Sequence, residues 1–254
     1  AILSAMNNAA AGHLSMRLGF KGPNFTYSCA CASSAVALGE AFHAIRYGRL
    51  ECALAGGAEA CIVEGVMRAW GALRVLAPPH SSGAAASCRP FSADRAGIVL
   101  GEGAAMFVLE DLESARRRGA PILAEVLGYR ATADASHITS PGVDGQARAM
   151  SGALVEAGLD PADIDYVNAH GTATRVGDVC ETHAIKRVFG ERAQGTPVSS
   201  TKSVHGHLLG AAGALEFAAC LQSMRGNFLP ATMHLAERDP ACDLDCVANA
   251  PRHG

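Results

Sequence analysis

The sequence has few aromatic residues, few charges and no long apolar run, and each shortage excludes a class of protein. Aromatic residues make up 5% and charged residues 18% of the 254 positions, whereas 49% are hydrophobic, which is typical of a globular domain and not of a disordered chain. Lysine and arginine total 21 against 24 acidic residues, without a long run of either sign, so a broad basic surface for nucleic acid is not expected. No run of about 18 apolar residues occurs, so a membrane-spanning helix is not expected either.

A secretory signal and an initiator methionine are also absent. The chain begins at Ala1 with no basic segment, and it soon turns polar at Asn7. Its 9 cysteines are scattered through apolar stretches, and an odd number predicts free thiols in a reducing compartment instead of a disulfide framework. No pair of cysteines has zinc-ligand spacing with a matching second pair, so no metal site is predicted. We therefore expect a cytoplasmic protein that is a piece of a longer one.

Short apolar runs alternate with longer segments of helical periodicity, which predicts an α/β fold with a substantially parallel sheet. Strands are expected at residues 25–29, 52–57, 98–109, 122–128, 166–168 and 197–200, of which 98–109 is expected to be long and buried. Helices are expected at residues 33–46, 59–69, 112–118, 146–157, 178–189 and 210–224. The 28 glycines and the few aromatic residues are typical of helices that pack closely on a sheet.

Two thiols stand where a predicted strand gives way to a predicted helix. Cys29 and Cys31 directly precede the helix expected from Ser33. A thiol at a helix N-terminus faces unpaired N–H groups and the positive end of the helix dipole, which lowers its pKa and favours the nucleophilic thiolate. A buried, inert thiol is the alternative. Because Cys29 and Cys31 share one face of a strand, position alone does not choose between them.

Histidines occupy two further junctions between predicted elements. His170 ends a strand and is followed by a glycine and two hydroxyl residues, Thr172 and Thr174, although a histidine satisfied in the core is the alternative there. Lys202, His205 and His207 stand at the junction before the last predicted helix. A metal site at the two histidines is discounted because no third ligand is near in the sequence. One thiol and two imidazoles at such junctions meet the requirement of thioester chemistry, a nucleophile with donors for developing negative charge.

The last predicted helix contains a single acid. Glu216 is the only acidic residue within 210–224, and a buried carboxylate is costly unless it is paired. We therefore predict that Glu216 forms an ion pair with Lys202, with a solvent-facing glutamate as the alternative.

Together these segments resemble the β-ketoacyl-acyl-carrier-protein synthases, the elongating condensing enzymes of type II fatty acid and polyketide synthesis. Residues 31–34 (Cys-Ala-Ser-Ser) match the family's nucleophile motif. Residues 168–174 (Asn-Ala-His-Gly-Thr-Ala-Thr) match its first histidine motif, and residues 202–207 (Lys-Ser-Val-His-Gly-His) match its lysine and second-histidine motif. The resemblance runs over essentially the whole chain but lacks the family's N-terminal portion and its C-terminal Gly-Phe-Gly-Gly-type loop, so we expect a chain truncated at both ends.

The resemblance implies a thiolase-like, layered αβαβα fold. Residues 1–110 would be the remainder of an incomplete N-terminal half that carries the nucleophile, and residues 111–254 would be most of the C-terminal half that carries the two histidines. The implied reaction is the decarboxylative Claisen condensation of an acyl thioester with malonyl-acyl-carrier protein. The residues it assigns to catalysis are Cys31, His170, His207 and Lys202, those to substrate binding are Thr172 and Thr174, and the one to structural support is Glu216.

The resemblance also implies the partners. Substrates would arrive on the phosphopantetheine of acyl carrier protein, no other cofactor or metal would be needed, and the full-length parent would be a homodimer that binds neither nucleic acid nor membrane. Two alternatives remain: a truncated, non-catalytic subunit that contributes only an interface, and a CoA-dependent thiolase. Thiolases share the fold but lack the two-histidine pattern, and His205 departs from the condensing-enzyme pattern, in which a small or neutral residue is commoner there.

Overall fold

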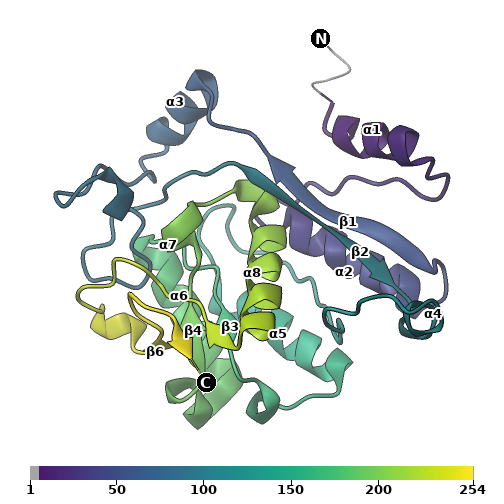
Figure 1. Cartoon of the computed structure of the whole chain (residues 1–254). Coiled ribbons are helices and arrows are strands. Elements are labelled where there is room, and N and C mark those ends of the chain that lie inside the picture. The colour runs from purple at the N-terminus through teal and green to yellow at the C-terminus, as the bar shows by residue number, and fades with distance from the viewer. Residues whose placement is uncertain (1–5, 254) are drawn as a thin grey trace.

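The alternation of helical and extended segments is retained in the computed structural model, which describes residues 6–253 (Figure 1). The helices are α1 (Ala9–Leu18), α2 (Ser33–Arg46), α3 (Glu64–Ala72), α4 (Leu112–Arg117), α5 (Val143–Ala157), α6 (Arg175–Phe189), α7 (Lys202–His205) and α8 (Ala212–Gly226). The strands are β1 (Cys52–Glu59), β2 (Gly103–Glu110), β3 (Val167–Asn168), β4 (Pro197–Ser199), β5 (Phe228–Leu229), β6 (Asp245–Cys246) and β7 (Arg252–His253).

The strands of the described residues form three small sheets. β1 and β2 are antiparallel and pair along their whole length, from Cys52 opposite Glu110 to Glu59 opposite Gly103. β4 lies between β3 and β6, and both of these pairings are parallel. β5 and β7 form a short antiparallel pair. The parallel pairing predicted from the sequence is therefore found in the second half of the chain, whereas the first half pairs antiparallel.

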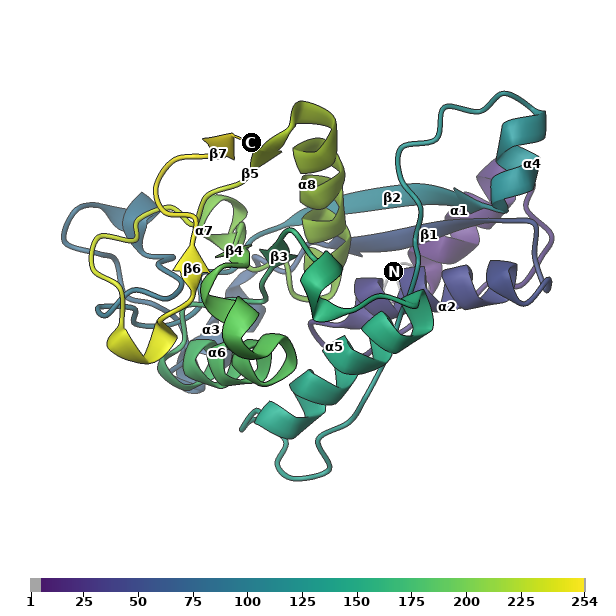
Figure 2. The same cartoon turned by 90° about the horizontal axis from the view of Figure 1, so that it is seen from below.

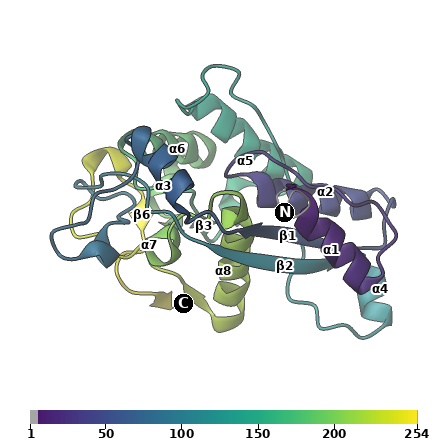
Figure 3. The same ribbon diagram turned by 90° about the horizontal axis from the view of Figure 1, so that it is seen from above.

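The helices α2 and α8 pack together against the β1–β2 sheet. Leu38 of α2, Ala55 of β1 and Ala214 of α8 are buried in one apolar cluster. The rings of Phe107 and Phe217 meet edge to face in the same cluster, with their centroids 4.9 Å apart. Figures 2 and 3 show α8 between the β1–β2 sheet and the parallel sheet. A helix from the second half of the chain thus completes the core of the first half.

Small residues let these elements approach very closely at the start of α2. A Cβ atom added to Gly57 of β1 would lie 2.6 Å from Ser34 Cβ, and one added to Gly213 of α8 would lie 3.0 Å from Ala35 Cβ. Glycine is therefore required at the first position, because real Cβ atoms do not approach other atoms so closely. The start of α2 is held tightly between a strand and a helix.

A second apolar cluster supports the parallel sheet. Phe91, Ile185, Val198 and Leu244 are completely buried in it. Each buried side chain of this size contributes about 1.5–3 kcal/mol to stability. Because Ile185 belongs to α6 and Val198 to β4, the cluster fixes the helix and the strand that flank the two histidine segments.

Two predicted strands are wrong. Residues 25–28 form no strand, and Phe25 is exposed, because no described strand pairs with this segment. The apolar run 122–128 is likewise unpaired, and the backbone at Gly128 packs directly on α5, where an added Cβ would lie 2.2 Å from the carbonyl oxygen of Ala153. Apolar character alone does not make a strand when its backbone finds no partner.

Two further boundaries differ from the prediction. The strand expected over 98–109 begins only at Gly103, and Val108 is exposed, because the preceding backbone bonds to loops: Gly101 N–H donates to His207 O. The helix expected over 59–69 begins at Glu64, since Glu59 is the last residue of β1. The other predicted helices lie where they were expected, with ends shifted by a few residues, whereas α1 and α7 were not predicted.

Two expectations drawn from composition concern the state of the cysteines and membrane-spanning helices. All 9 cysteines are free, and 5 of them are buried: Cys61, Cys88, Cys180, Cys242 and Cys246. Within residues 6–253, no helix has the length and apolar character needed to cross a membrane.

Candidate active site

Cys31 occupies a tight turn that leads directly into α2. Ala32 N–H donates to Cys29 O at 3.1 Å, which closes the turn, and Ala30 at its centre has φ +50°. This left-handed conformation costs a residue with a Cβ about 1–2 kcal/mol. Ser33 compensates by holding both sides of the turn, since its Oγ donates to Ala30 O and accepts Cys29 N–H. This strained turn positions the Cys31 side chain.

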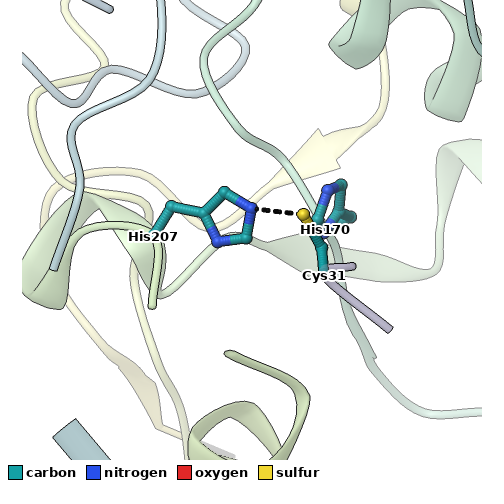
Figure 4. A group of neighbouring side chains, drawn as sticks. All are labelled: Cys31, His170 and His207. Atoms are coloured by element: carbon teal, nitrogen blue, oxygen red, sulfur yellow. Dashed lines mark hydrogen bonds between the residues drawn. The ribbon is translucent and has the colours of Figure 1, made fainter. Parts of the chain in front are cut away.

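His207 donates a hydrogen bond to the sulfur of Cys31. Its Nε2 lies 2.9 Å from Cys31 Sγ (Figure 4). Its other ring nitrogen, Nδ1, faces the Leu209 N–H at 3.2 Å, and an N–H group can only donate. The proton of a neutral His207 must therefore be on Nε2, directed at the sulfur. Backbone bonds fix the ring's position, because His207 N–H donates to Val99 O at 2.7 Å.

His170 lies beside this pair, and an acid that the sequence analysis did not single out holds its backbone. The ring centroids of His170 and His207 are 5.2 Å apart with the planes at 86°. The Glu181 carboxylate, from α6, accepts His170 N–H at 2.6 Å and Gly171 N–H at 2.7 Å. The only sequence signal for Glu181 was an acid in the helix that follows the first histidine motif, and any such helix can carry a solvent-facing acid.

The predicted ion pair between Lys202 and Glu216 is confirmed. The Lys202 ammonium is fully buried at the start of α7, and the Glu216 side chain on α8 is 16% exposed. Lys202 Nζ donates to Glu216 Oε1. The ammonium also acts at a distance, since its charge contributes to lowering the pKa of both active-site histidines.

The pKa of Cys31 contradicts the sequence prediction of an acidified thiol. Desolvation raises the pKa of Cys31 above its ordinary 9.0, and the opposing influence of the Lys202 charge is smaller. Desolvation, followed by Lys202, lowers the pKa of His207 to about 3. His170 is exposed, yet enough protein surrounds its ring for desolvation to hold its pKa well below 6.5. At neutral pH the site therefore contains a neutral thiol and two neutral imidazoles.

The two threonines of the first histidine motif are arranged differently from each other. Thr172 is buried, and its hydroxyl lies 3.1 Å from that of Thr174. Thr174 Oγ1 accepts Gly177 N–H at 3.2 Å and so caps the start of α6. Thr174 therefore has a structural role at the start of α6 in addition to the substrate contact predicted for it.

Cys31, His170 and His207 also lie close enough together to be ligands of one metal ion, which the sequence did not suggest. One possible ligand atom from each residue lies within 4.8 Å of those of the other two. The metal site discounted from the sequence was at His205 and His207, whereas in the structure His207 meets His170 and Cys31, and His205 is not a member of the group.

A hollow lies beside this group without including it. It has a volume of about 540 Å³ and is lined by Ala58, Glu59, Ala60, Glu102, Gly103 and Ala104. Glu59 connects the hollow with the site, because its Oε2 accepts Gly210 N–H at 3.1 Å and its charge raises the pKa of Cys31.

Comparison with known families agrees with this geometry. Residues 1–115 match the profile of the β-ketoacyl synthase N-terminal domain, and residues 123–236 match that of the β-ketoacyl synthase C-terminal domain. The chain belongs to the β-ketoacyl synthase family. The three residues that meet in the structure are thus the ones singled out by the motif resemblance.

Named relatives of this β-ketoacyl synthase chain include nodulation protein E of Rhizobium leguminosarum bv. trifolii. It is 51% identical over 247 residues, which is 97% of this chain and 60% of the relative. The 3-oxoacyl-[acyl-carrier-protein] synthase 2 of Staphylococcus aureus is 46% identical over 242 residues, which is 94% of this chain and 60% of the relative. The chain therefore spans about 60% of the length of these curated relatives.

Solved structures of ketosynthases have the same fold. A type II polyketide synthase acyl-carrier protein in complex with its ketosynthase bound to the hexaketide matches with a TM-score of 0.94 and 36% identity, over 96% of this chain and 60% of the other. A β-ketoacyl synthase from Burkholderia phymatum STM815 matches with a TM-score of 0.92 and 42% identity, over 97% of this chain and 60% of the other. The thiolase-like ketosynthase fold expected from the motifs is confirmed, and the chain covers part of it.

Proposed function

We propose that this chain carries the active site of a condensing enzyme that joins an acyl thioester to malonyl-acyl-carrier protein with loss of CO₂. The observation that carries the proposal is the His207 tautomer, which aims an N–H donor at the Cys31 sulfur while His170 stands beside it. A nucleophilic sulfur flanked by two neutral donors suits a reaction in which negative charge develops on thioester oxygens.

In the first half-reaction the acyl group moves from the carrier's pantetheine sulfur to Cys31. The Cys31 sulfur attacks the thioester carbonyl, its proton leaves with the departing pantetheine thiol, and a new thioester forms on the protein. The raised pKa of Cys31 means that little thiolate exists beforehand at neutral pH. The sulfur therefore acquires its charge during attack, where the His207 N–H and the Lys202 ammonium stabilise it.

In the second half-reaction malonyl-acyl-carrier protein loses CO₂, and its enolate attacks the Cys31 thioester. The carbon chain grows by two carbons, and the electron pair of the carbon–sulfur bond returns to Cys31. His170 and His207 donate hydrogen bonds to the enolate oxygen, each worth about 3 kcal/mol by analogy with oxyanion-hole donors. As proposed, the reaction uses no metal or organic cofactor, because the sulfur and the leaving CO₂ supply the chemistry.

The remaining assignments belong to the same proposal. Thr172 and Thr174 contact the pantetheine amides, Lys202 orients the histidines and Glu216 supports Lys202. The acyl carrier protein is the partner, the working form is a homodimer and the location is the cytoplasm. A solved relative that is a ketosynthase in complex with an acyl-carrier protein supports the choice of partner.

The test supplies the purified protein with an acyl-carrier protein loaded with an acyl group and a second one loaded with malonate. Mass spectrometry of the carrier then detects the β-ketoacyl product and, in the protein, the acylated cysteine. We expect the acyl group on Cys31, and no product from Cys31→Ala, while Cys29→Ala serves as the matched thiol control.

Three outcomes would contradict the proposal. Acylation of Cys29 with Cys31 untouched would show that the nucleophile is misassigned. Product formation from acyl-CoA and acetyl-CoA without any carrier protein would favour a thiolase. Binding of the carrier without acylation of any cysteine would favour a non-catalytic subunit.

A further inference from the structure

Cys31, His170 and His207 have ligand properties beyond the condensation proposed above. Each offers one sulfur or ring nitrogen, and these three atoms lie within 4.8 Å of one another. The donor set is one thiol and two imidazoles, which is the ligand type that zinc and other thiophilic cations prefer. Carboxylates, which favour hard cations such as Mg²⁺, do not belong to this group.

The three atoms lie within 4.8 Å of one another, so modest movements would bring them to the spacing of a tetrahedral zinc site. Zinc lies about 2.0–2.1 Å from a histidine nitrogen and about 2.3 Å from a thiolate, so its ligand atoms are about 3.3–3.6 Å apart. Cys31 Sγ and His207 Nε2 are 2.9 Å apart and would separate slightly to admit the ion. The ligand nitrogen of His170 lies within 4.8 Å of the other two atoms and would move inward to bind the ion, and the exposure of this residue gives access from solvent.

We propose that Cys31, His170 and His207 together bind one thiophilic divalent cation, for which zinc is the probe, through Cys31 Sγ and one ring nitrogen of each histidine. Binding forms a metal–sulfur bond and releases the thiol proton to the buffer. The sulfur electron pair is then engaged with the metal, so the bound state cannot be acylated. This site does not depend on the condensation reaction, and it can be tested without any activity measurement.

Two features of the surroundings limit the affinity. Nε2 of His207 binds the metal only when the proton moves to Nδ1, where it faces the Leu209 N–H, donor against donor, at 3.2 Å. The ring must shift to relieve this contact, and losing the hydrogen bond lowers the affinity by about tenfold to a hundredfold. The Lys202 ammonium repels a cation, although Glu216 neutralises it. The structure thus points to reversible occupancy that competes with substrate, and not to a permanent structural metal.

Cobalt(II) provides the direct measurement, because a cobalt–thiolate bond gives a charge-transfer absorption band. We expect one equivalent of Co²⁺ to produce the band in the unmodified protein, and one equivalent of Zn²⁺ to abolish it. Cys31→Ser should lose the band, and His170→Gln and His207→Gln should each weaken binding by at least about 100-fold. Cys29→Ser and His183→Gln, which change an exposed thiol and an exposed histidine, are the matched controls and should bind as the parent does.

A second measurement uses only the unmodified protein, in case the variants fold poorly. Zn²⁺ should slow the alkylation of Cys31 by iodoacetamide, followed by mass spectrometry, while the rate at Cys29 stays the same. Mg²⁺ at the same concentration should have no effect. A cobalt band that persists in Cys31→Ser, or equal alkylation of Cys31 with and without Zn²⁺, would overturn the proposal.

Discussion

Replacing Glu216 by alanine should destabilise the protein by leaving a buried ammonium without its counter-ion. Lys202 is fully buried, and the carboxylate of Glu216 is the partner that its Nζ contacts. A charge left alone in a protein interior keeps its desolvation cost and loses the compensating attraction. The perturbation removes one carboxylate and leaves every other contact of Lys202 in place.

The expected loss is about 3 kcal/mol. Breaking a buried ion pair by removing one partner costs about 3–5 kcal/mol, and the lower end applies because the Glu216 side chain is 16% exposed. With a urea m value of about 3 kcal/mol/M, the unfolding midpoint should fall by about 1 M. The variant should therefore unfold at clearly lower urea while keeping the parental slope.

Removing both charges should restore the stability. Desolvation raises the pKa of Glu216 above 4.5 even though Lys202 opposes the shift. The free energy lost by desolvating the ionised carboxylate is therefore larger than the free energy gained from its attraction to Lys202. A raised folded-state pKa of an acid means that this contribution to stability declines as the pH rises through it. The double variant Lys202→Met with Glu216→Leu should thus be as stable as the parent or more so.

Urea unfolding followed by far-UV circular dichroism measures these differences. The matched control is Glu64→Ala, which breaks an exposed pair with Arg68 one helical turn away, and such pairs contribute only about 0.3–0.5 kcal/mol. If Glu216→Ala unfolds at the same urea concentration as Glu64→Ala, the Lys202 ammonium is solvated in solution and the reasoning is wrong. A double variant much less stable than Glu216→Ala would refute the desolvation argument as well.

The remaining predictions concern the site and its support. His207→Ala should slow malonyl decarboxylation by about 10²–10³-fold, measured as CO₂ release, because one enolate donor is lost; a parental rate would make His207 structural. Glu181→Gln should slow condensation by about tenfold to a hundredfold while Glu181→Asp recovers part of it, because an amide accepts only one of the two backbone N–H groups. Burial raises the pKa of Asp178 to about 7, so this carboxyl favours the folded state less as the pH rises from 3.8 to about 7. Over this range the free energy of unfolding of the parent should fall by up to about 4 kcal/mol more than that of Asp178→Asn. Parallel pH profiles of the two proteins would contradict this.

Local sequence signals were sufficient for five of the helices, and they singled out Cys31, His170 and His207, which lie together in the structure. The helix from Ser33 to Arg46 was predicted with both ends correct, because its apolar residues recur at helical spacing. The pairing of Lys202 with Glu216 followed from a single acid in an apolar helix. In each case the decisive information lies in one short segment or in a rule about burying charge.

The features that were missed depend on contacts between distant segments. The run 122–128 is as apolar as a strand, but no described strand lies beside it. Glu181 could not be distinguished from a surface acid until α6 was placed against the backbone of His170. The pKa of Cys31 was predicted in the wrong direction because the helix start is visible in the sequence, whereas the desolvation by surrounding elements is not.

The surroundings of Cys31 stabilise a negative charge that forms on the sulfur during the proposed reaction, but they do not keep the resting thiol ionised. The His207 N–H, the Lys202 ammonium and the N-terminus of α2 all present positive potential to the sulfur. Desolvation nevertheless keeps the thiol protonated at rest, since it outweighs the Lys202 charge. The Leu209 amide fixes the ring of His207 and the Glu181 carboxylate holds the backbone of His170, so the two histidines need not reorganise when an anion appears. Fixed donors in a desolvated site stabilise transient negative charge most strongly, which is what the proposed thioester attack and enolate formation require.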